Sequence, residues 1–169
     1  MRITIVDQND SIIGAKDKDF RQPNDIYRVS ALWLTNSRGE VLLAQRSFSN
    51  DNDPGKWGPA VAGTVEQGET YESNIIKEIA EEIGLNIPLA ALKKGPKTFR
   101  EKPERKYFCQ WYIYQTDKSA SEFNVQRSEV EKVQWFDRET VKKMVAEKPD
   151  NFLQIIRQWA NGKIDFSSR

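Results

Sequence analysis

The 169-residue sequence predicts an α/β fold in which a mixed central sheet carries helices on both faces. Two observations lead to this prediction. Short apolar runs, separated by Asn, Asp, Gly or Pro, indicate strands along most of the chain. Amphipathic segments with helical spacing follow them in the middle and at the end of the sequence. No repeat, low-complexity tract or long linker divides the chain, so we expect one domain over residues 1–169.

The strands are expected in the following order. Two short strands around the turn DQND form an N-terminal β-hairpin extension over about residues 1–25. The next two flank NSRGE, where Asn36 and Gly39 supply the turn chemistry of a second hairpin. Later, a long apolar run pairs with a short strand across the charged loop EKPER. The expected strands span residues 3–6, 11–14, 29–35, 41–45, 60–66, 98–100, 106–116 and 130–136.

A central helix is expected directly after Thr70, which is a good N-cap residue. Gly84 supplies a left-handed stop, and Leu85 can fold back on the last turn. One face carries an apolar stripe that can be buried against the sheet. The stripe consists of Ile75, Ile76, Ile79 and Ile83.

Two further amphipathic helices are expected near the end of the chain, within about residues 138–160. The first covers 138–147 and has Asp137 as a plausible N-cap, and the second covers 151–159. Pro149 marks the break between them, because proline cannot continue a helix. With the central helix, they would cover both faces of the sheet.

The central helix also has an acidic face. Glu78, Glu81 and Glu82 stand at i, i+3 and i+4, a spacing that places them on one side of an α-helix. Like charges at this spacing repel by a few tenths of a kcal/mol. A hard divalent cation such as Mg²⁺, which takes oxygen ligands, would explain them. An ordinary solvated helix accounts for the spacing about equally well.

The stretch GTVEQGETYESNIIKEIAEEIGL, residues 63–85, resembles the Nudix box, G-x5-E-x7-R-E-U-x-E-E-x-G-U, where U is a bulky aliphatic residue. Lys77 stands where the family has Arg and is the one departure. A wider resemblance, including VSALWLTNSRGEVLLAQRS and PGKWGPAVAGTVEQGE, is to the branch that contains isopentenyl-diphosphate isomerase and its hydrolase-like relatives. The resemblance implies a Nudix-type α/β/α sandwich. The matching residues are Gly63, Glu69, Glu78, Ile79, Glu81, Glu82, Gly84 and Leu85.

The resemblance also implies an activity, the metal-dependent cleavage of a diphosphate linkage in a nucleotide or related compound. Mg²⁺ is the expected cofactor, with Mn²⁺ as a possible substitute. By match to the motif, Glu78, Glu81 and Glu82 are metal ligands, and Glu78 or a nearby acid is the base. The backbone carbonyl of Ala62 or Gly63 would complete the metal site. Glu69 is expected to support the helix and the metal ligands.

Lys77 replaces the rigid, bidentate fork of Arg with a flexible point charge, which can pair with Glu81 or reach Glu69. We expect weaker pre-organisation of the carboxylates but an active site that still works. Arg46 stands where an arginine of the isomerase-like branch contacts the diphosphate. A plain surface salt bridge is the alternative for Arg46, and a surface position is the alternative for Lys77.

Two aromatic residues, Phe48 and Trp57, flank the polar loop before the box and could stack on a base, although a core or loop-anchoring position is favoured. An extra acid could also reach the site from a loop or strand. The candidates are Glu101, Glu104, Glu129 and Glu131, with a slight preference for Glu129.

Composition narrows the classes of function. The 26 Lys and Arg residues nearly balance the 25 Asp and Glu residues, which argues against binding to nucleic-acid polymers or membrane surfaces through bulk charge. The absence of histidine excludes Ser-His and Cys-His catalysis and histidine-ligated zinc. The single cysteine, Cys109, and the lack of a signal peptide or membrane span favour the cytoplasm. A small-molecule substrate is expected. The oligomeric state, monomer or homodimer, is left open by the sequence.

Two other functions compete with hydrolysis. An isopentenyl-diphosphate isomerase is disfavoured, because that branch uses a cysteine just before the box and metal-binding histidines, whereas the segment here reads WGPAVAGT. Cys109 lies far away, in the apolar run YFCQWYIY. A non-catalytic nucleotide-binding module is the other alternative. Lys77 is its only support, since all the box glutamates are present.

Overall fold

The computed structural model describes residues 1–167. In this part of the chain nine strands form one mixed sheet, and three α-helices pack on it. The strands are β1 (Arg2–Val6), β2 (Ile12–Asp17), β3 (Ile26–Thr35), β4 (Val41–Arg46), β5 (Trp57–Pro59), β6 (Val61–Thr64), β7 (Lys93–Lys102), β8 (Arg105–Gln115) and β9 (Val130–Phe136). The helices are α1 (Tyr71–Ile83), α2 (Arg138–Glu147) and α3 (Gln154–Ala160).

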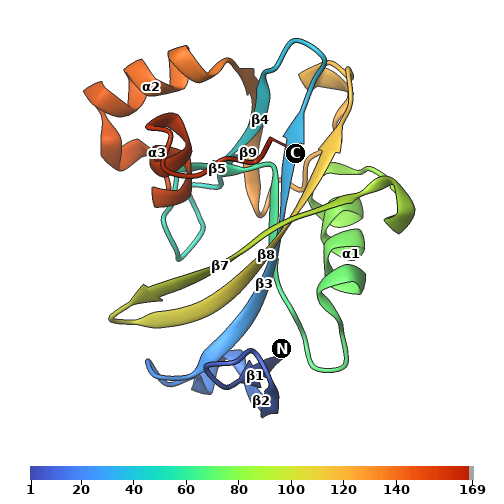
Figure 1. The fold of residues 1–169 in the computed structure, drawn as a ribbon, viewed down its shortest axis with the longest axis vertical. Coiled ribbons are helices and arrows are strands. Elements are labelled where there is room, and N and C mark those ends of the chain that lie inside the picture. The colour runs from blue at the N-terminus through green and yellow to red at the C-terminus, as the bar shows by residue number, and fades with distance from the viewer. Residues whose placement is uncertain (168–169) are drawn as a thin grey trace.

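The helices lie on both sides of the sheet, with α1 on one side and α2 and α3 on the other (Figure 1). Two hydrophobic clusters fill the two interfaces. The cluster under α1 contains the buried isoleucines of its apolar stripe and the inward side chains of β3 and β4, such as Leu32 and Leu42. The other contains Trp33, Trp111 and residues of α2 and α3. The predicted α/β sandwich with a mixed sheet is therefore confirmed.

Strand β3 forms the centre of one half of the sheet. It pairs in parallel with β8 and in antiparallel with β6, whereas β4 pairs with β5 and β9. The hairpin expected between β3 and β4 is therefore wrong in its extent, because the two strands pair only at Thr35 and Val41. Beyond this point the two strands separate: β3 continues between β6 and β8, and β4 continues between β5 and β9. The short β3–β4 contact thus connects the two halves of the sheet.

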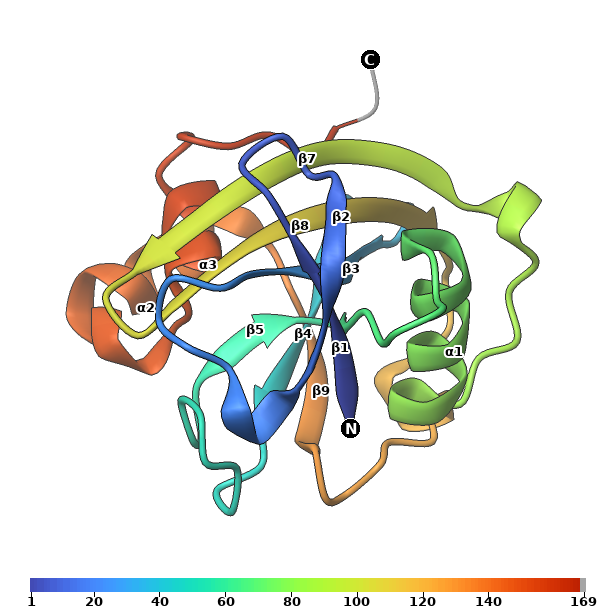
Figure 2. The ribbon, with the colours of Figure 1, turned by 90° about the horizontal axis from the view of Figure 1, so that it is seen from below.

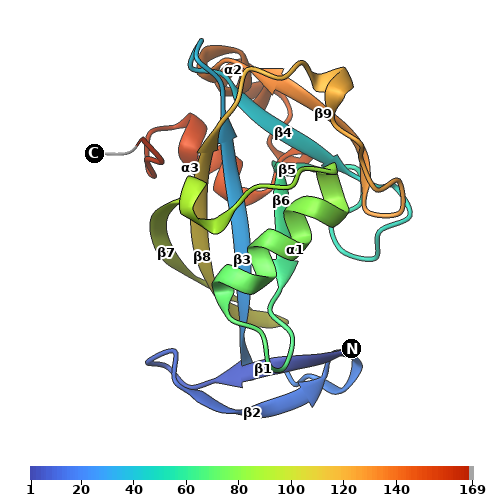
Figure 3. The ribbon, with the colours of Figure 1, turned by 90° about the vertical axis from the view of Figure 1, so that its right-hand side faces the viewer.

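The N-terminal hairpin β1–β2 extends this sheet at the lower end of β3 (Figure 3). Its tip contains Asp10, which has a left-handed backbone (φ 63°) and a side chain that is 12% exposed. The Asp10 carboxylate accepts hydrogen bonds from Arg28 Nε at 2.7 Å and Tyr71 Oη at 3.0 Å, and it pairs with Lys97. The hairpin is thereby fixed to β3, β7 and the first residue of α1.

The central helix begins and ends as the sequence predicts. Thr70 Oγ1 accepts the amide of Ser73 and Ser73 Oγ accepts the amide of Thr70, which forms a capping box. Gly84 adopts the left-handed conformation at φ 70° and ends the helix. The isoleucines at 75, 79 and 83 are fully buried. This burial leaves the neighbouring, acidic side of α1 available for other contacts.

Several boundaries differ from the prediction; for example, β2 ends at Asp17 and β3 begins at Ile26. The strand expected over 60–66 is shortened to β6, which pairs with β3, and β5, which pairs with β4 just before it, was not predicted. Strand β7 is longer than expected, since its partly exposed, Lys-rich first half has no apolar pattern. The last helix starts at Gln154, because Pro149 begins a short 3₁₀ turn first. No helix in residues 1–167 is long and apolar enough to span a membrane.

Candidate active site

The acidic face of α1 meets the backbone of β6. A Cβ at Gly63 would lie only 2.2 Å from Glu78 Cδ, so a glycine is required for the carboxylate to approach the strand this closely. One turn further along, Glu82 Oε2 accepts a hydrogen bond from the Ala62 amide at 3.3 Å. The helix therefore brings two carboxylates against two consecutive peptide units of β6.

Within residues 1–167, Lys77 Nζ, at 3.8 Å from Glu78, is the one cationic group in ion-pair contact with these two carboxylates. Burial, together with the nearby charge of Glu78, raises the pKa of Glu82 to about 8. Burial also raises the pKa of Glu78 against the opposing charge of Lys77, and the neighbouring Glu81 adds to the increase. Glu81 itself is exposed at the rim. Without a bound cation, Glu78 and Glu82 therefore keep their protons to a higher pH than an ordinary glutamate.

Glu69 has a different environment from the other box glutamates. Its carboxylate accepts the backbone amide of Glu66 at 3.0 Å and pairs with Lys77 Nζ at 2.7 Å. Lys77 also contacts Glu66 at 2.8 Å, and these partners lower the pKa of Glu69 against the opposing effect of burial. Of the two predicted partners of Lys77, Glu69 is therefore the one it contacts, and this pair braces the loop before α1.

Asn74 connects the two kinds of glutamate and was not predicted from the sequence. Its side chain is completely buried, and its Nδ2 lies 2.9 Å from Glu69 Oε2, 3.3 Å from Glu78 Oε1 and 3.1 Å from the Thr64 carbonyl. Ser30 Oγ donates to Asn74 Oδ1. An asparagine inside a helix, four residues before a box glutamate, was the available signal, because this residue is a poor helix former.

Arg46 and Glu129 also influence the electrostatics of Glu82. The charge of Glu129 raises the pKa of Glu82, and that of Arg46 lowers it, so both lie within electrostatic range. The loop after β4 holds them: Arg46 Nη2 donates to Asn50 Oδ1 at 2.9 Å, and Asn50 Nδ2 donates to Glu129 Oε2 at 3.2 Å. Among the candidate extra acids, Glu129 is the one that this arrangement brings near the box.

The other candidate acids lie elsewhere. Glu101 and Glu104 belong to the β7–β8 hairpin, where Glu101 pairs with Lys106 at 2.9 Å. Glu131 follows Glu129 on β9, and its carbonyl accepts a hydrogen bond from Arg127. The structure does not bring these three side chains into contact with the box glutamates.

The two candidate aromatic residues differ in exposure. Trp57 is 8% exposed and packs edge-on against Phe136, with Lys132 over its ring. Phe48 is 67% exposed and packs on Gly55 in the loop after β4. Trp57 therefore occupies the favoured core position, and Phe48 is the aromatic side chain open to a ligand. Their part in substrate binding stays a prediction.

The donor set fits a hard divalent cation. Within residues 1–167 no three acidic, cysteine or histidine side chains are already gathered as a cage. Even so, two buried carboxylates, a third at the rim and the adjoining peptide carbonyls are the oxygen ligands that Mg²⁺ prefers. A cation between Glu78 and Glu82 would relieve the repulsion that raises their pKa. Glu81 would complete the set by turning inward.

Comparison with known proteins agrees with this geometry. The Nudix domain model matches residues 26–155, which leaves the N-terminal hairpin outside the match. A prenyl-diphosphate phosphatase of Methanosarcina mazei is 29% identical over 92% of this chain and 91% of its own. An isopentenyl-diphosphate isomerase of Klebsiella pneumoniae is 29% identical, over 50% of this chain and 47% of its own.

Solved structures show the same fold. A protein of Deinococcus radiodurans superposes with a TM-score of 0.71 at 24% identity, covering 88% of this chain and 90% of its own. The Nudix domain of Shewanella oneidensis NrtR, in complex with ADP ribose, gives a TM-score of 0.58 at 20% identity. The match covers 88% of this chain and 94% of that domain's chain. Because the domain model spans most of the sequence and the acidic face of α1 lies where the motif requires it, the chain belongs to the Nudix hydrolase family.

Proposed function

We propose that this protein hydrolyses a diphosphate linkage in a small phosphorylated molecule and that it requires Mg²⁺ or Mn²⁺. Glu78, Glu81 and Glu82 would hold the cation, with the backbone carbonyl of Ala62 or Gly63 as a further ligand. The observation that carries the proposal is the contrast in pairing along α1. Glu69 is neutralised by Lys77 at 2.7 Å, whereas Glu78 and Glu82 are partly buried within electrostatic range of each other and have raised pKa values.

A bound divalent cation supplies positive charge to phosphate oxygens and lowers the pKa of bound water. The remaining tasks fall to this chain. Glu78 or Glu129 would take the proton from the attacking water, since both lie within electrostatic range of Glu82. Arg46 ends β4 near the same carboxylates and can donate to a phosphate oxygen of the substrate. Lys77 and Asn74 keep the carboxylates in position.

The substrate class is a diphosphate-containing small molecule, either a nucleotide derivative or a prenyl diphosphate. The first rests on the complex of the Shewanella oneidensis domain with ADP ribose, the second on the phosphatase of Methanosarcina mazei. The near balance of charge speaks against nucleic-acid polymers and membrane surfaces as partners. The one cysteine is buried and free, which fits a reducing compartment such as the cytoplasm.

Isomerisation of a prenyl diphosphate has less support. The isomerase-like branch requires a reactive cysteine, but Cys109 is buried on β8 in the opposite cluster from α1. Burial raises the pKa of its thiol far above the ordinary value, so the reactive thiolate is suppressed. A non-catalytic binding module would rest on Lys77 alone, and the contact between Lys77 and Glu69 supplies the bracing that the family arginine is expected to give.

A hydrolysis screen tests the proposal. Purified protein should release phosphate or a nucleotide from at least one prenyl diphosphate, ADP-ribose, sugar nucleotide or dinucleoside polyphosphate with Mg²⁺, and EDTA should stop the reaction. Glu78→Gln should lower kcat at least about a hundredfold. Glu72→Gln is the matched control, because Glu72 lies on the same helix and pairs with Lys94 outside the site. Equal activity of the two variants would contradict the assignment.

A further inference from the structure

Four basic side chains gather on the sheet face opposite α1. Arg100 and Lys102 lie on β7, Arg105 lies on β8, and Arg157 lies on α3; we call them the cation cluster. The β7–β8 hairpin extends to the side of the molecule that carries α3 and the β4–β5 loop, as two perpendicular views show (Figures 1 and 2). Segments distant in sequence thus bring positive charge to one place.

The strand register explains the convergence. Arg100 is paired with Tyr107 and Lys102 with Arg105 across the antiparallel β7–β8 ladder. Directly opposed residues point to the same face of a sheet, with Cβ atoms about 5 Å apart. Tyr107 packs against the cluster that contains α2 and α3, so Arg100, Lys102 and Arg105 also face that side. The placement of these three cations on one face is therefore a consequence of the strand register.

The cation cluster has too few anions. Arg105 Nη2 donates to Asp53 at 2.9 Å, and Asp53 also pairs with Lys56 at 3.1 Å. Arg105 Nε is buried without a hydrogen-bond acceptor. Within residues 1–167 the side chains of the other three cluster members have neither a hydrogen-bond acceptor nor an ion-pair partner. In the described part of the chain, residues 1–167, Asp53 is the one carboxylate in ion-pair contact with a member of the cluster, and the charge of the nearby Glu104 offsets only part of the surplus at Lys102.

This crowding has an electrostatic cost. Burial lowers the pKa of Arg100, and the charges of Arg105 and Arg157 lower it further. The pKa of Lys102 is lowered in the same way, first by burial and then by Arg105. Like charges in a partly buried place destabilise the protein unless an anion joins them. A phosphate group suits the cluster, because guanidinium forks donate to its oxygens in pairs.

We propose that the cation cluster binds a phosphate group that the substrate carries apart from its diphosphate linkage, an assignment that rests on the proposed hydrolysis. The preferred substrate would then be a diphosphate compound with a further phosphate on its remote part. A prenyl diphosphate would not satisfy the cluster, since its remote part is a hydrocarbon. A free phosphate anion has the same chemistry and is the other possible source.

The loop between β4 and β5 links the cation cluster to the box glutamates. Asp53 of this loop accepts a hydrogen bond from Arg105, and the carbonyl of Asn52 accepts a hydrogen bond from Arg46 Nε at 2.8 Å. Asn50 of the same loop contacts both Arg46 and Glu129. A substrate with its diphosphate at Arg46 and its remote phosphate at the cation cluster would therefore lie along this loop.

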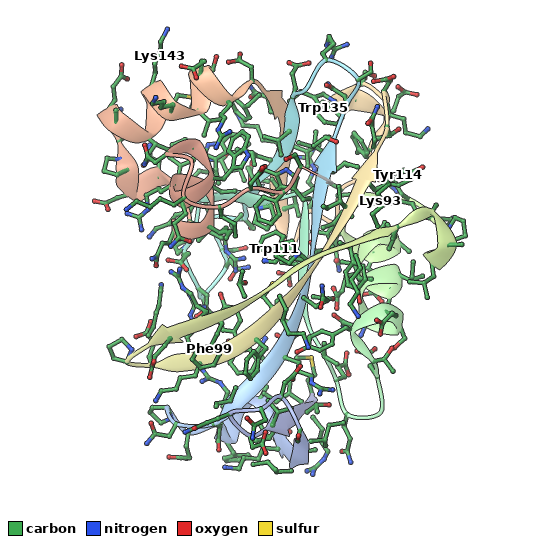
Figure 4. All side chains as sticks on the ribbon, in the orientation of Figure 1. Lys93, Phe99, Trp111, Tyr114, Trp135 and Lys143 are labelled. Atoms are coloured by element: carbon green, nitrogen blue, oxygen red, sulfur yellow. The ribbon has the colours of Figure 1, made fainter. Side chains whose placement is uncertain are left out.

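Binding to the metal-free protein tests the site without relying on catalysis. In EDTA the box carboxylates carry no metal and repel anions, so binding of inorganic phosphate should occur at the cation cluster. The binding is measured by titrating phosphate and recording the chemical shifts of the backbone amides. Arg100→Gln and Lys102→Gln should each weaken binding about tenfold. Lys143→Gln removes the same charge from the middle of α2 (Figure 4) and should bind like wild type. Undetectable binding, or equal losses in all three variants, would overturn the site.

Stability gives a second measurement on the same variants. Because they remove crowded positive charge, Arg100→Gln and Lys102→Gln should leave the melting temperature unchanged or raise it. A clear fall in both would mean that these cations stabilise the fold, and it would overturn the proposal.

The substrate assignment has its own test. NADPH and NADH both contain a diphosphate linkage, and NADPH carries one remote phosphate more. Metal-free wild type should bind NADPH about tenfold more tightly, and Arg100→Gln should lose this preference. Equal binding of the two by wild type, with phosphate binding intact, would overturn the substrate assignment in favour of a free anion. Neither result depends on turnover, so failure of the proposed hydrolysis would be recognised separately.

Discussion

The two ends of α1 hold acidic groups in opposite ways. At the start of the helix, Asp10 accepts hydrogen bonds from Arg28 and Tyr71 and pairs with Lys97, and these partners lower its pKa despite burial. In the last turns, Glu78 and Glu82 lie against β6, and burial raises their pKa values. The first arrangement is internally neutralised, whereas in the second the cations Lys77 and Arg46 only partly offset the effects of burial and like charge.

The difference indicates which carboxylates stabilise the fold and which are available to a ligand. A buried carboxylate with its own cations stabilises the fold in one protonation state and offers little to a ligand. Buried carboxylates without cations cost stability and are retained where a ligand supplies the charge. The comparison therefore predicts that mutations near Asp10 affect folding, whereas mutations at Glu78 and Glu82 affect catalysis.

The largest effect is expected for Glu82→Gln. The amide keeps the shape of the side chain but removes a charge from the proposed metal site, so kcat should fall by about a hundredfold or more. The metal-free variant should be at least as stable as wild type, because an unfavourable buried charge is lost. Steady-state kinetics and thermal unfolding in EDTA measure both properties. Loss of stability with full activity would reverse the assigned roles of the two helix ends.

Asp10→Ala should have the next largest effect, on folding. Removing one member of a buried charge network leaves Arg28 and Lys97 without their acceptor and should cost about 3 kcal/mol of unfolding free energy. Urea denaturation measures this cost. Asp10→Asn is the matched control, because asparagine tolerates the left-handed backbone at φ 63° and keeps some hydrogen bonds. It should lose less stability than Asp10→Ala, and kcat per folded molecule should change little in either variant.

The pH dependence of stability should distinguish the same two regions. The pKa of Glu82 is raised from its ordinary value of 4.5 to about 8, so the folded protein binds an additional proton between these values. The associated stability is fully present below pH 4.5 and is lost as the pH rises through about 8. In EDTA, wild type should therefore melt at a lower temperature at pH 8.5 than at pH 6. Glu82→Gln should show a smaller decrease, and an unchanged pH profile would contradict the raised pKa.

The parts of the site that could be predicted depend on residues close to one another in the sequence. Thr70, Gly84 and the isoleucine stripe define α1 by themselves, and the spacing of its glutamates follows from helix geometry. Asn74 and Ser30 could not be paired from the sequence, because β3 and α1 are 44 residues apart at this contact. The short pairing of β3 with β4 was also missed, since alternation predicts strands but not their partners.

The smallest expected effect concerns Lys77, whose ammonium lies between Glu66 and Glu69 and 3.8 Å from Glu78. Lys77→Arg would replace this point charge by a planar fork that can hold both braced carboxylates in fixed positions. One improved charged contact is worth roughly 1 kcal/mol, so activity should match or exceed wild type by up to several-fold. Lys77→Ala should lower activity, because Glu69 and Glu66 would then repel each other beside the box. Kinetics across a Mg²⁺ titration measure both variants. If Lys77→Ala were indistinguishable from wild type, pairing at Glu69 would be irrelevant to catalysis, and the contrast between paired and unpaired acids would apply to folding alone.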